Sequence, residues 1–573
     1  MVTPGHAMRA YHAAQLGDLY VKRYERLANE EDLERALESY KSGGCDPASV
    51  VKHRFRVGRA YAILAHRSGR LEEAMTAYTN GIDLLPRLAW LGMDHKSIFS
   101  QLLSEAPTLA CDAAACACTL GRYEQAIVLL EQGRAVFWQQ QASLSTQNQE
   151  LLQEHPQLAA ELQQTGRALE IDTQAGNAPQ DGIVPRRRLA QRWNSLVEQI
   201  RRLDGFSNFL QPMTYEELRE PLEHGGTPIF LIASDYGCSA LIMTKNNPVR
   251  YVPLTGTSRE RLKSIAIVMH KGVVVPKDSL GTQNLERLVR TVINELWRDV
   301  GSPIWNVLST LGLGPLPLVW WIPTGVLGLL PIHAACPANP DEPGLPDLIT
   351  SSYLVLLHSL VRTFRKLQQQ GSNPPRRVLM VAQPKVDSFV ELPSVKEELK
   401  VLRQILPEDK LIVLEGEDAS VENVTNALGT ERWIHFACHG HQDQVAPLES
   451  CLVLADGKLR LSTLISHGAH DPNSFAFLLA CHTARGCPAL PDEMLHIAAA
   501  LEFAGFGSVV GSAWAIADRD APLMTSRVYR YLTSEGGALD PSKSAEALRV
   551  AVTALRRAGV PAHRWAPFLH FGR

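Results

Sequence analysis

The sequence predicts a multidomain protein, with an all-α N-terminal region followed by an α/β region whose sheet is covered by helices. Two patterns lead to this fold class. Up to about residue 202 the apolar residues recur at helical spacing, and beyond residue 227 short apolar runs alternate with helical segments. Strands that are apolar throughout are typical of a sheet with both faces buried. A chain of 573 residues is long enough for roughly two to four domains.

Residues 1–150 contain a repeated spacing of small and large residues. A glycine is followed by an alanine after five residues, a large apolar residue after four more and a second glycine after three more. The spacing occurs at Gly69, Ala74, Tyr78 and Gly81, again at Gly121, Ala126, Leu130 and Gly133, and without its first glycine at Ala36, Tyr40 and Gly43. It resembles the tetratricopeptide repeat, a helical hairpin of about 34 residues. The alanines are 38 (36 to 74) and 52 (74 to 126) residues apart, so the array is irregular.

Arrays of this kind usually bind a protein on their concave face. We therefore expect the repeats to recruit a protein substrate or a protein regulator, and another type of α-hairpin solenoid is the alternative. Residues 151–210 continue the helical pattern with a turn-like break at residues 175–182, which indicates a helical hairpin or linker.

Residues 211–375 and 376–573 make up the predicted α/β region. In the first part, "IFLIAS" and "CSALIMT" flank Asp235, Tyr236 and Gly237, which is a hairpin pattern. Residues 300–340 contain no charged side chain, but prolines interrupt them repeatedly. Because proline breaks helices, we expect a buried strand, loop and helix here instead of a membrane span.

Composition narrows the function classes. The net charge is −3 and no basic block is present, which argues against nucleic acid as a partner. The N-terminal residues lack the continuous apolar stretch of a secretory signal. Ten cysteines in a chain of this length are expected to be reduced thiols in the cytoplasm.

Two of the predicted strands end in residues that can do chemistry. "WIHFAC" is followed by His439, and "AFLLAC" ends at Cys481. In open α/β sheets, ligands bind outside the carboxyl ends of the strands. If these strands are parallel neighbours, a thiol and an imidazole emerge at one edge. The imidazole would take the thiol proton, and the thiolate is the competent nucleophile.

The ordered motifs around these residues resemble the CHAT family, caspase-like cysteine peptidases coupled to tetratricopeptide repeats. They are "HFACHG", "FLLACHTA", "PDEMLHIAAALEFAGFGSVVGSAWAIAD" and "WAPFLHFG", with "WWIPTGVLGLLPIHAA" upstream. The resemblance implies a CHAT domain over about residues 290–573, in which residues 376–573 are the active half. Residues 211–375 would include a degenerate half. It also implies an endopeptidase with His439 as base and Cys481 as nucleophile, although His482 replaces the expected small residue or glutamine.

Further site residues are expected around this dyad. The backbone N–H groups of Gly440 and Cys481 are the natural oxyanion donors. By resemblance, Ser512 and Trp514 follow the strand that borders the pocket for the P1 residue of the substrate. Asp518 and Asp456 would attract a basic P1 residue. The alternative for Asp518 is a cap on the helix that begins near Asp520.

Two other functions fit the same residues. One is a non-catalytic signalling scaffold that binds partners through the repeats. The other is a zinc-dependent hydrolase, since His435, His439, His441, Cys438 and Cys481 are residue types that bind zinc. No Cys-x-x-Cys or His-Glu-x-x-His pattern organises them, so we expect no metal and no cofactor. We expect His435 to point into the core or to pair locally, and Cys438 to serve packing. We expect His441 to be solvated, with contact to the substrate as the alternative.

Overall fold

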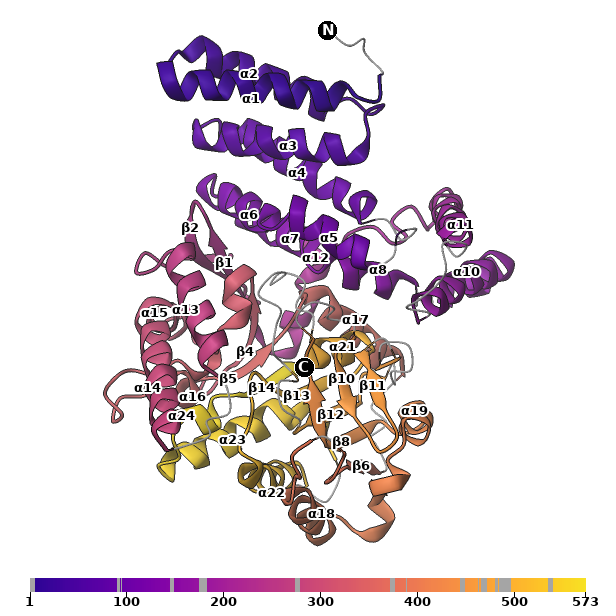
Figure 1. The fold of residues 1–573 in the computed structure, drawn as a ribbon, viewed down its shortest axis with the longest axis vertical. Coiled ribbons are helices and arrows are strands. Elements are labelled where there is room, and N and C mark those ends of the chain that lie inside the picture. The colour runs from indigo at the N-terminus through magenta and orange to yellow at the C-terminus, as the bar shows by residue number, and fades with distance from the viewer. Residues whose placement is uncertain are drawn as a thin grey trace. The chain divides into compact units, whose positions relative to one another are not determined.

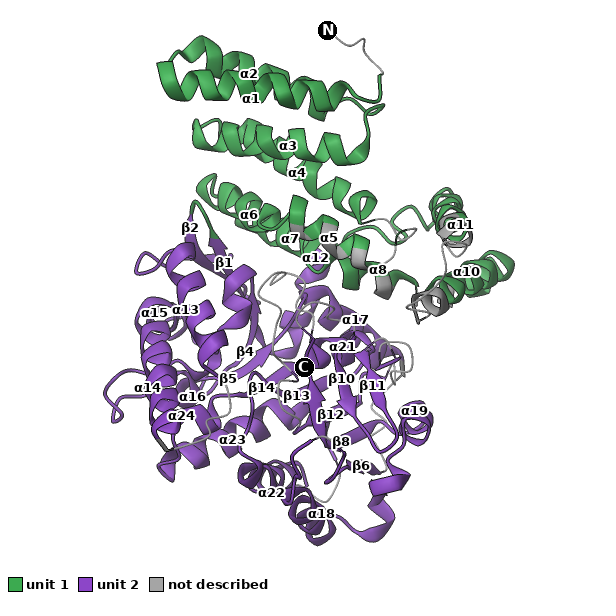
Figure 2. Cartoon of the chain, in the orientation of Figure 1, with its two compact units in different colours: residues 1–215, 234–236 green, residues 216–233, 237–573 purple. Residues whose placement is uncertain are grey.

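The computed structural model describes most of the chain as two compact units. The described residues are 6–89, 93, 95–144, 149–174, 183–273, 279–370, 377–387, 389–443, 449–461, 463–464, 471–479, 483, 496–533 and 539–573. Unit 1 comprises residues 1–215 and 234–236, and unit 2 comprises residues 216–233 and 237–573 (Figure 2). The division of the sequence into four segments stays a prediction.

The described part of residues 6–214 is helical, which confirms the all-α N-terminal region. Its helices are α1 (Arg9–Leu27), α2 (Glu30–Gly44), α3 (Val51–Arg67), α4 (Leu71–Leu88), α5 (His95–Glu105), α6 (Leu109–Thr119), α7 (Tyr123–Gly133), α8 (Val136–Leu144), α9 (Gln149–Glu154), α10 (Pro156–Gln174) and α11 (Ile183–Arg201) (Figure 1). Helices α1 and α2, α3 and α4, and α6 and α7 pack as sequential pairs.

The repeated glycines and alanines have distinct roles in these pairs. Gly69 and Gly121 have φ angles of 76° and 72°, a left-handed conformation that favours glycine and ends helices. The next residue after each closes the turn, as when the Arg70 N–H donates to the Ala65 carbonyl oxygen at 2.8 Å. Ala74 and Ala126 are fully buried. In this spacing the first glycine therefore ends one helix, and the alanine packs in the interior of the next.

The last glycine of the spacing marks close approach of two helices. A Cβ on Gly133 would lie 2.8 Å from the Ala110 Cβ, and a Cβ on Gly43 would lie 2.7 Å from the Ala13 Cβ. Both distances are too short for two methyl groups, so the residue must stay small. These contacts support helical hairpins, while their assignment as tetratricopeptide repeats remains a prediction.

The end of unit 1 has a hydrophobic cluster of its own. Trp193 and Leu196 of α11 pack with Leu162 and Leu169 of α10 in one buried cluster. This arrangement fits the helical hairpin expected for residues 151–210. The turn expected at residues 175–182 lies outside the described residues.

In the residues that the structure describes, unit 2 is built on one mixed sheet of eleven strands. Their order is β3-β2-β1-β4-β5-β14-β13-β12-β8-β6-β7. The strands are β1 (Thr227–Ser234), β2 (Gly237–Ile242), β3 (Arg250–Pro253), β4 (Leu318–Pro323), β5 (Thr350–Tyr353), β6 (Val378–Ala382), β7 (Leu411–Glu415), β8 (Trp433–Ala437), β12 (Phe475–Leu478), β13 (Ser508–Ser512) and β14 (Phe568–Gly572). The two predicted α/β parts thus share one sheet, joined where β5 pairs with β14.

A small antiparallel sheet lies beyond the end of β8. It consists of β9 (His439–His441), β10 (Cys451–Val453) and β11 (Lys458–Arg460). Because β9 begins two residues after β8 ends, this sheet continues the chain directly from the carboxyl edge of the large one.

Helices cover the large sheet on both sides. They are α12 (Tyr215–Leu218), α13 (Arg259–Gly272), α14 (Ser279–Leu296), α15 (Ser302–Leu308), α16 (Leu345–Leu348), α17 (Leu357–Gln370), α18 (Ser394–Ile405), α19 (Val421–Leu428), α21 (Ile497–Phe503), α22 (Ala521–Leu532), α23 (Ser544–Arg557) and α24 (Ala562–Trp565). Figure 1 shows α18, α22 and α23 along one side of the sheet and α21 along the other. This arrangement confirms the predicted α/β class.

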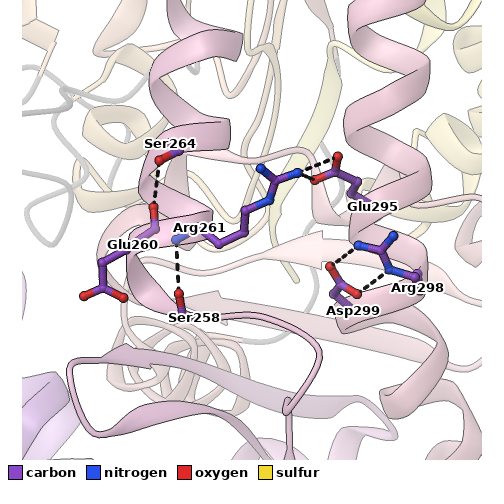
Figure 3. Close-up of polar contacts among 7 residues, drawn as sticks. All are labelled: Ser258, Glu260, Arg261, Ser264, Glu295, Arg298 and Asp299. Carbon is purple, nitrogen blue, oxygen red and sulfur yellow. Dashed lines mark hydrogen bonds and ion pairs between the residues drawn. The ribbon is translucent and has the colours of Figure 1, made fainter.

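Polar contacts join α13 to α14 at the surface of unit 2. The Arg261 guanidinium donates from one nitrogen to both carboxylate oxygens of Glu295 at 2.8 Å, while its backbone N–H donates to the Ser258 hydroxyl, which caps α13 (Figure 3). An exposed ion pair contributes only about 0–1 kcal/mol. The buried apolar face of these helices, including Leu262 and Leu296, is therefore the larger stabilising term.

The uncharged segment at residues 300–340 contains helix α15, then the buried strand β4, then two short 3-10 helices, so its α-helix precedes the strand. It includes β4, whose Trp320 and Trp321 side chains are buried. In the described part of the chain, no helix has both the length and the apolar character to span a membrane.

Candidate active site

The strands that carry the two candidate catalytic residues are parallel neighbours. In their register Phe475 of β12 lies opposite Trp433 of β8, and Leu478 lies opposite Phe436. The Leu479 N–H extends the pairing by donating to the Phe436 carbonyl oxygen at 3.1 Å. Both strands therefore end at the same edge of the sheet.

His439 begins β9 just beyond the end of β8, and its side chain is half-buried. Its Nε2 lies 2.7 Å from the carbonyl oxygen of Val390. Because a carbonyl oxygen only accepts hydrogen bonds, Nε2 must carry the proton. The neutral ring then keeps its lone pair on Nδ1. The Phe389 ring also contacts the imidazole, with ring centroids 5.0 Å apart.

Val390 and Phe389 are site residues that the sequence did not reveal. They lie in the loop between β6 and α18. Val390 precedes His439 by 49 residues. A backbone carbonyl carries no residue-type signal. The available signal was two adjacent apolar residues inside a polar loop.

Cys481 and His482 lie outside the described residues, so their expected roles stay predictions. The described residues on either side of them, Leu479 and Thr483, are anchored. The Thr483 hydroxyl accepts the Ser512 N–H at 3.0 Å, and its carbonyl oxygen accepts the Ala498 N–H at 2.9 Å. Leu479 thus lies beside β8, and Thr483 lies at the end of β13.

The substrate-pocket candidates on the next strand are buried. Ser512 ends β13, which is parallel to β12, and its side chain is fully buried. The Trp514 indole is also buried, and its Nε1–H donates to the His563 carbonyl oxygen at 3.0 Å. Ser512 therefore lies at the same sheet edge as the end of β12. Gly440 is half-buried in β9, opposite Leu452 of β10.

The two aspartates expected near the pocket each contact a helix N-terminus. One Asp518 carboxylate oxygen accepts the Ser394 N–H of α18 at 3.0 Å, and one Asp456 oxygen accepts the Val421 N–H of α19 at 2.8 Å. The alternative for Asp518 was therefore right about capping but wrong about the helix. The helix near Asp520 is α22, and the buried Asp520 carboxylate pairs with Arg564 instead of capping it.

A buried polar network lies behind β8. The fully buried His435 has Nε2 3.0 Å from a Glu398 carboxylate oxygen and Nδ1 3.2 Å from the Tyr529 hydroxyl. The Thr525 hydroxyl donates to the same Glu398 oxygen at 3.1 Å. Burial raises the pKa of Glu398, and the bond with His435 opposes that rise. The network ties α18 and α22 to β8, and it confirms that His435 points into the core.

Glu398 was also missed from the sequence, although a signal was present. It occupies the apolar face of α18, between Val395 and Leu402, at helical spacing. A carboxylate in such a position must have a buried partner. The partner itself, on another element, could not be deduced.

The described residues of the alternative zinc site differ in their exposure to solvent. Cys438 is buried, and burial raises its thiol pKa, which keeps it protonated and fits the expected packing role. His441 is exposed, as expected. Among the residues that the structure describes, no group of three or more histidine, cysteine or acidic side chains could hold a metal ion.

Comparison with known proteins identifies one domain family and several solved structures of low sequence identity. Residues 283–573 match the family model of the CHAT domain. A chain of the Saccharomyces cerevisiae separase–securin complex is similar, with 10% identity and a TM-score of 0.46, over 98% of this chain and 46% of that chain. A chain of the Porphyromonas gingivalis RgpB pro- and mature-domain complex matches with 10% identity and a TM-score of 0.33, over 55% and 75%. This chain spans about half the length of the separase–securin chain. No curated protein sequence matches it.

Proposed function

The chain belongs to the CHAT domain family, and from this premise we propose that it is a cysteine endopeptidase that cleaves a protein substrate. Cys481 is the proposed nucleophile and His439 the proposed base. The observation that carries the proposal is the bond from His439 Nε2–H to the Val390 carbonyl oxygen, at the carboxyl edge where β8 and β12 end side by side.

That bond supports the role of His439 as a base. It sets the tautomer, because the proton on Nε2 leaves Nδ1 as the nitrogen that can accept a thiol proton. It also limits rotation of the ring. Orientation of the base by a third group is the usual arrangement in nucleophilic catalysis. The contacts of the flanking residues support the same geometry, since Leu479 pairs with Phe436 of β8 and Thr483 accepts the Ser512 N–H of β13.

The proposed reaction has two steps. His439 takes the Cys481 thiol proton, and the thiolate attacks the substrate carbonyl carbon. A C–S bond forms, the C–N bond breaks, and the proton on His439 goes to the leaving amine. Water then attacks the thioester, gives a proton to His439 and releases the carboxylate product, while the thiol is restored.

Stabilisation of the oxyanion is proposed for the backbone N–H groups of Gly440 and Cys481, since both follow strands that end at this edge. Ser512 and Trp514 are proposed as walls of the P1 pocket. Asp518 and Asp456 are proposed to attract a basic P1 residue by charge. Each of these two carboxylates already caps a helix, so direct contact with substrate would use the other oxygen.

The helical repeats are proposed to recruit a protein substrate or a protein regulator, in the cytoplasm and without nucleic acid or membrane as partner. The close helix contacts at Gly43 and Gly133 support a rigid array. Rigid arrays of helical hairpins present extended binding surfaces.

The test is thiol reactivity of the full chain near neutral pH. Iodoacetamide should label Cys481 faster than the buried Cys438 and Cys451, measured by peptide mass spectrometry, because thiolate is the reactive form. His439→Ala should slow the labelling of Cys481. His441→Ala, an exposed position two residues later in β9, is the matched control and should leave the labelling rate unchanged.

Cleavage separates the proposal from its alternatives. Cys481→Ala and His439→Ala should each abolish cleavage of a protein bound by the repeats. Equal labelling of Cys481 with and without His439 would contradict the dyad. Loss of activity with a chelator, together with one bound zinc per chain, would favour the metal hydrolase. Unchanged signalling by Cys481→Ala would favour the scaffold.

A further inference from the structure

We propose that the side chains of Phe389 and Val390 form a subsite that selects an apolar residue immediately after the cleaved bond, the P1′ position of the substrate. This inference rests on the peptidase proposed above. It deepens that proposal by assigning specificity to a loop that the sequence did not implicate.

The loop presents these two side chains outward beside the candidate base. Phe389 is 41% exposed and Val390 is 81% exposed. Meanwhile the Phe389 ring contacts the His439 ring, and the Val390 carbonyl oxygen accepts its Nε2–H. The backbone of this loop thus orients the imidazole, and its side chains project into solvent next to it.

Backbone hydrogen bonds hold the loop in this shape. The Gln383 N–H donates to the Ala437 carbonyl oxygen of β8 at 2.9 Å, which fixes the start of the loop to the sheet. The Leu392 N–H donates to the Pro384 carbonyl oxygen at 2.8 Å, which closes it. These hydrogen bonds therefore keep the aromatic and the β-branched side chain exposed. Contact of both apolar side chains with water is unfavourable in free energy when no ligand is bound.

The chemistry of the reaction says which part of the substrate meets this loop. The base must hand its proton to the leaving amine, so the amine nitrogen has to approach the His439 ring. The P1′ residue is attached to that nitrogen. Its side chain consequently lies on the His439 side of the site, where the Phe389 ring packs against the imidazole and Val390 is the next residue of the loop. The P1 residue lies on the opposite side, toward β13.

The charges on the loop disfavour an acidic occupant, because Lys385 (+1), Asp387 (−1) and Glu391 (−1) together give it a net charge of −1. Lys385 pairs with Glu391, with Nζ and Oε1 3.4 Å apart, and both side chains are exposed. This pair has no net charge to offer a ligand. Burial against Phe389 and Val390 would remove an apolar P1′ side chain from water. A charged one would lose hydration at this apolar contact, and an acidic one would also face the negative charge of Asp387. Differences in apolar contact typically change kcat/KM by about tenfold or more.

The experiment uses the full chain and a proteome-derived peptide library, with new N-termini identified by mass spectrometry. Each new N-terminus is a P1′ residue, and peptides also produced by Cys481→Ala are subtracted. We expect apolar residues to exceed charged ones at P1′ by about tenfold. The double variant Phe389→Ser with Val390→Ser keeps the Val390 carbonyl and should bring that ratio close to one, while the preference at P1 persists.

Ile267→Ser on α13 is the matched control, since Ile267 is also an apolar side chain that is 41% exposed. It should keep the P1′ ratio of the unmodified chain. Cleavage that depends on Cys481 but shows an even P1′ distribution overturns the subsite and leaves the peptidase standing. An apolar preference that survives in the double variant also overturns the subsite. A library that the unmodified chain leaves uncut overturns the peptidase and this inference together.

Discussion

His496 should make unit 2 less stable in mild acid. Its ring is almost fully buried, and Nδ1 accepts the Ala499 N–H at 3.0 Å, which caps α21. Burial lowers the pKa of His496 from 6.5 to about 3. Protonation at Nδ1 would remove the acceptor that the cap needs, so the geometry and the direction of the shift agree.

The sign and size follow from linkage. Below about pH 6.5 the unfolded chain gains a proton at this histidine that the folded chain does not bind, so stability falls as the pH falls from 6.5 toward 3. At pH 5 the difference is roughly 1.5 pH units, or about 2 kcal/mol at about 1.4 kcal/mol per unit. A loss of about 2 kcal/mol corresponds to roughly a 30-fold decrease in the equilibrium constant for folding.

Native-state hydrogen exchange at the amides of β13 measures this loss without requiring the two units to unfold together. After correction for intrinsic exchange, protection in the unmodified chain should fall between pH 7 and pH 5. In His496→Asn the fall should be about 30-fold smaller, since asparagine can cap the helix but does not titrate. The exposed His441→Asn is the control and should behave like the unmodified chain. An equal fall in His496→Asn would refute the reasoning.

Two further pairs of substitutions test a glycine turn and a buried polar contact. Gly121→Ala should destabilise the helices by about 1 kcal/mol and lower their melting temperature, because φ is positive there. Gly58→Ala, with open space at the Cβ, should stabilise them by about 0.5–1 kcal/mol. Circular-dichroism melts that give the reverse order of melting temperatures would contradict this. Glu398→Ala should cost about 3 kcal/mol, because His435 and Thr525 lose a buried partner. Glu398→Gln, which keeps an acceptor oxygen, should cost about 1 kcal/mol, and equal urea midpoints for the two variants would argue against a polar role.

The elements of the fold were predictable where one segment carries its own signal. Apolar runs such as "WIHFAC" and "AFLLAC" became β8 and the part of β12 that the structure describes, because a strand buried on both faces must be apolar throughout. The spacing that begins at Gly69 and Gly121 predicted paired helices, and the structure adds that these two glycines end helices with positive φ angles. The pairing of β8 with β12 was a condition of the predicted dyad, and their parallel register confirms it.

The rest depends on contacts between distant segments. The carbonyl of Val390 has the same chemistry as any other carbonyl, so only the fold shows that it meets His439. Asp518 reads as a cap for the nearest helix, yet in the structure it caps α18, whose Ser394 lies 124 residues earlier. The distance from Cys481 to His439 remains a prediction, since Cys481 lies outside the described residues.

The position of β14 has a consequence for how the protein is made. This strand joins β5 to β13 and so links the two halves of the sheet, yet it is translated about 215 residues after β5 (Tyr353 to Phe568). At a synthesis rate of about 5–20 residues per second, β5 waits roughly 10–40 s on the ribosome for its neighbour. Throughout that interval its unpaired edge is open to other strands. Nascent chains that end before β14 should therefore be the species that chaperones hold.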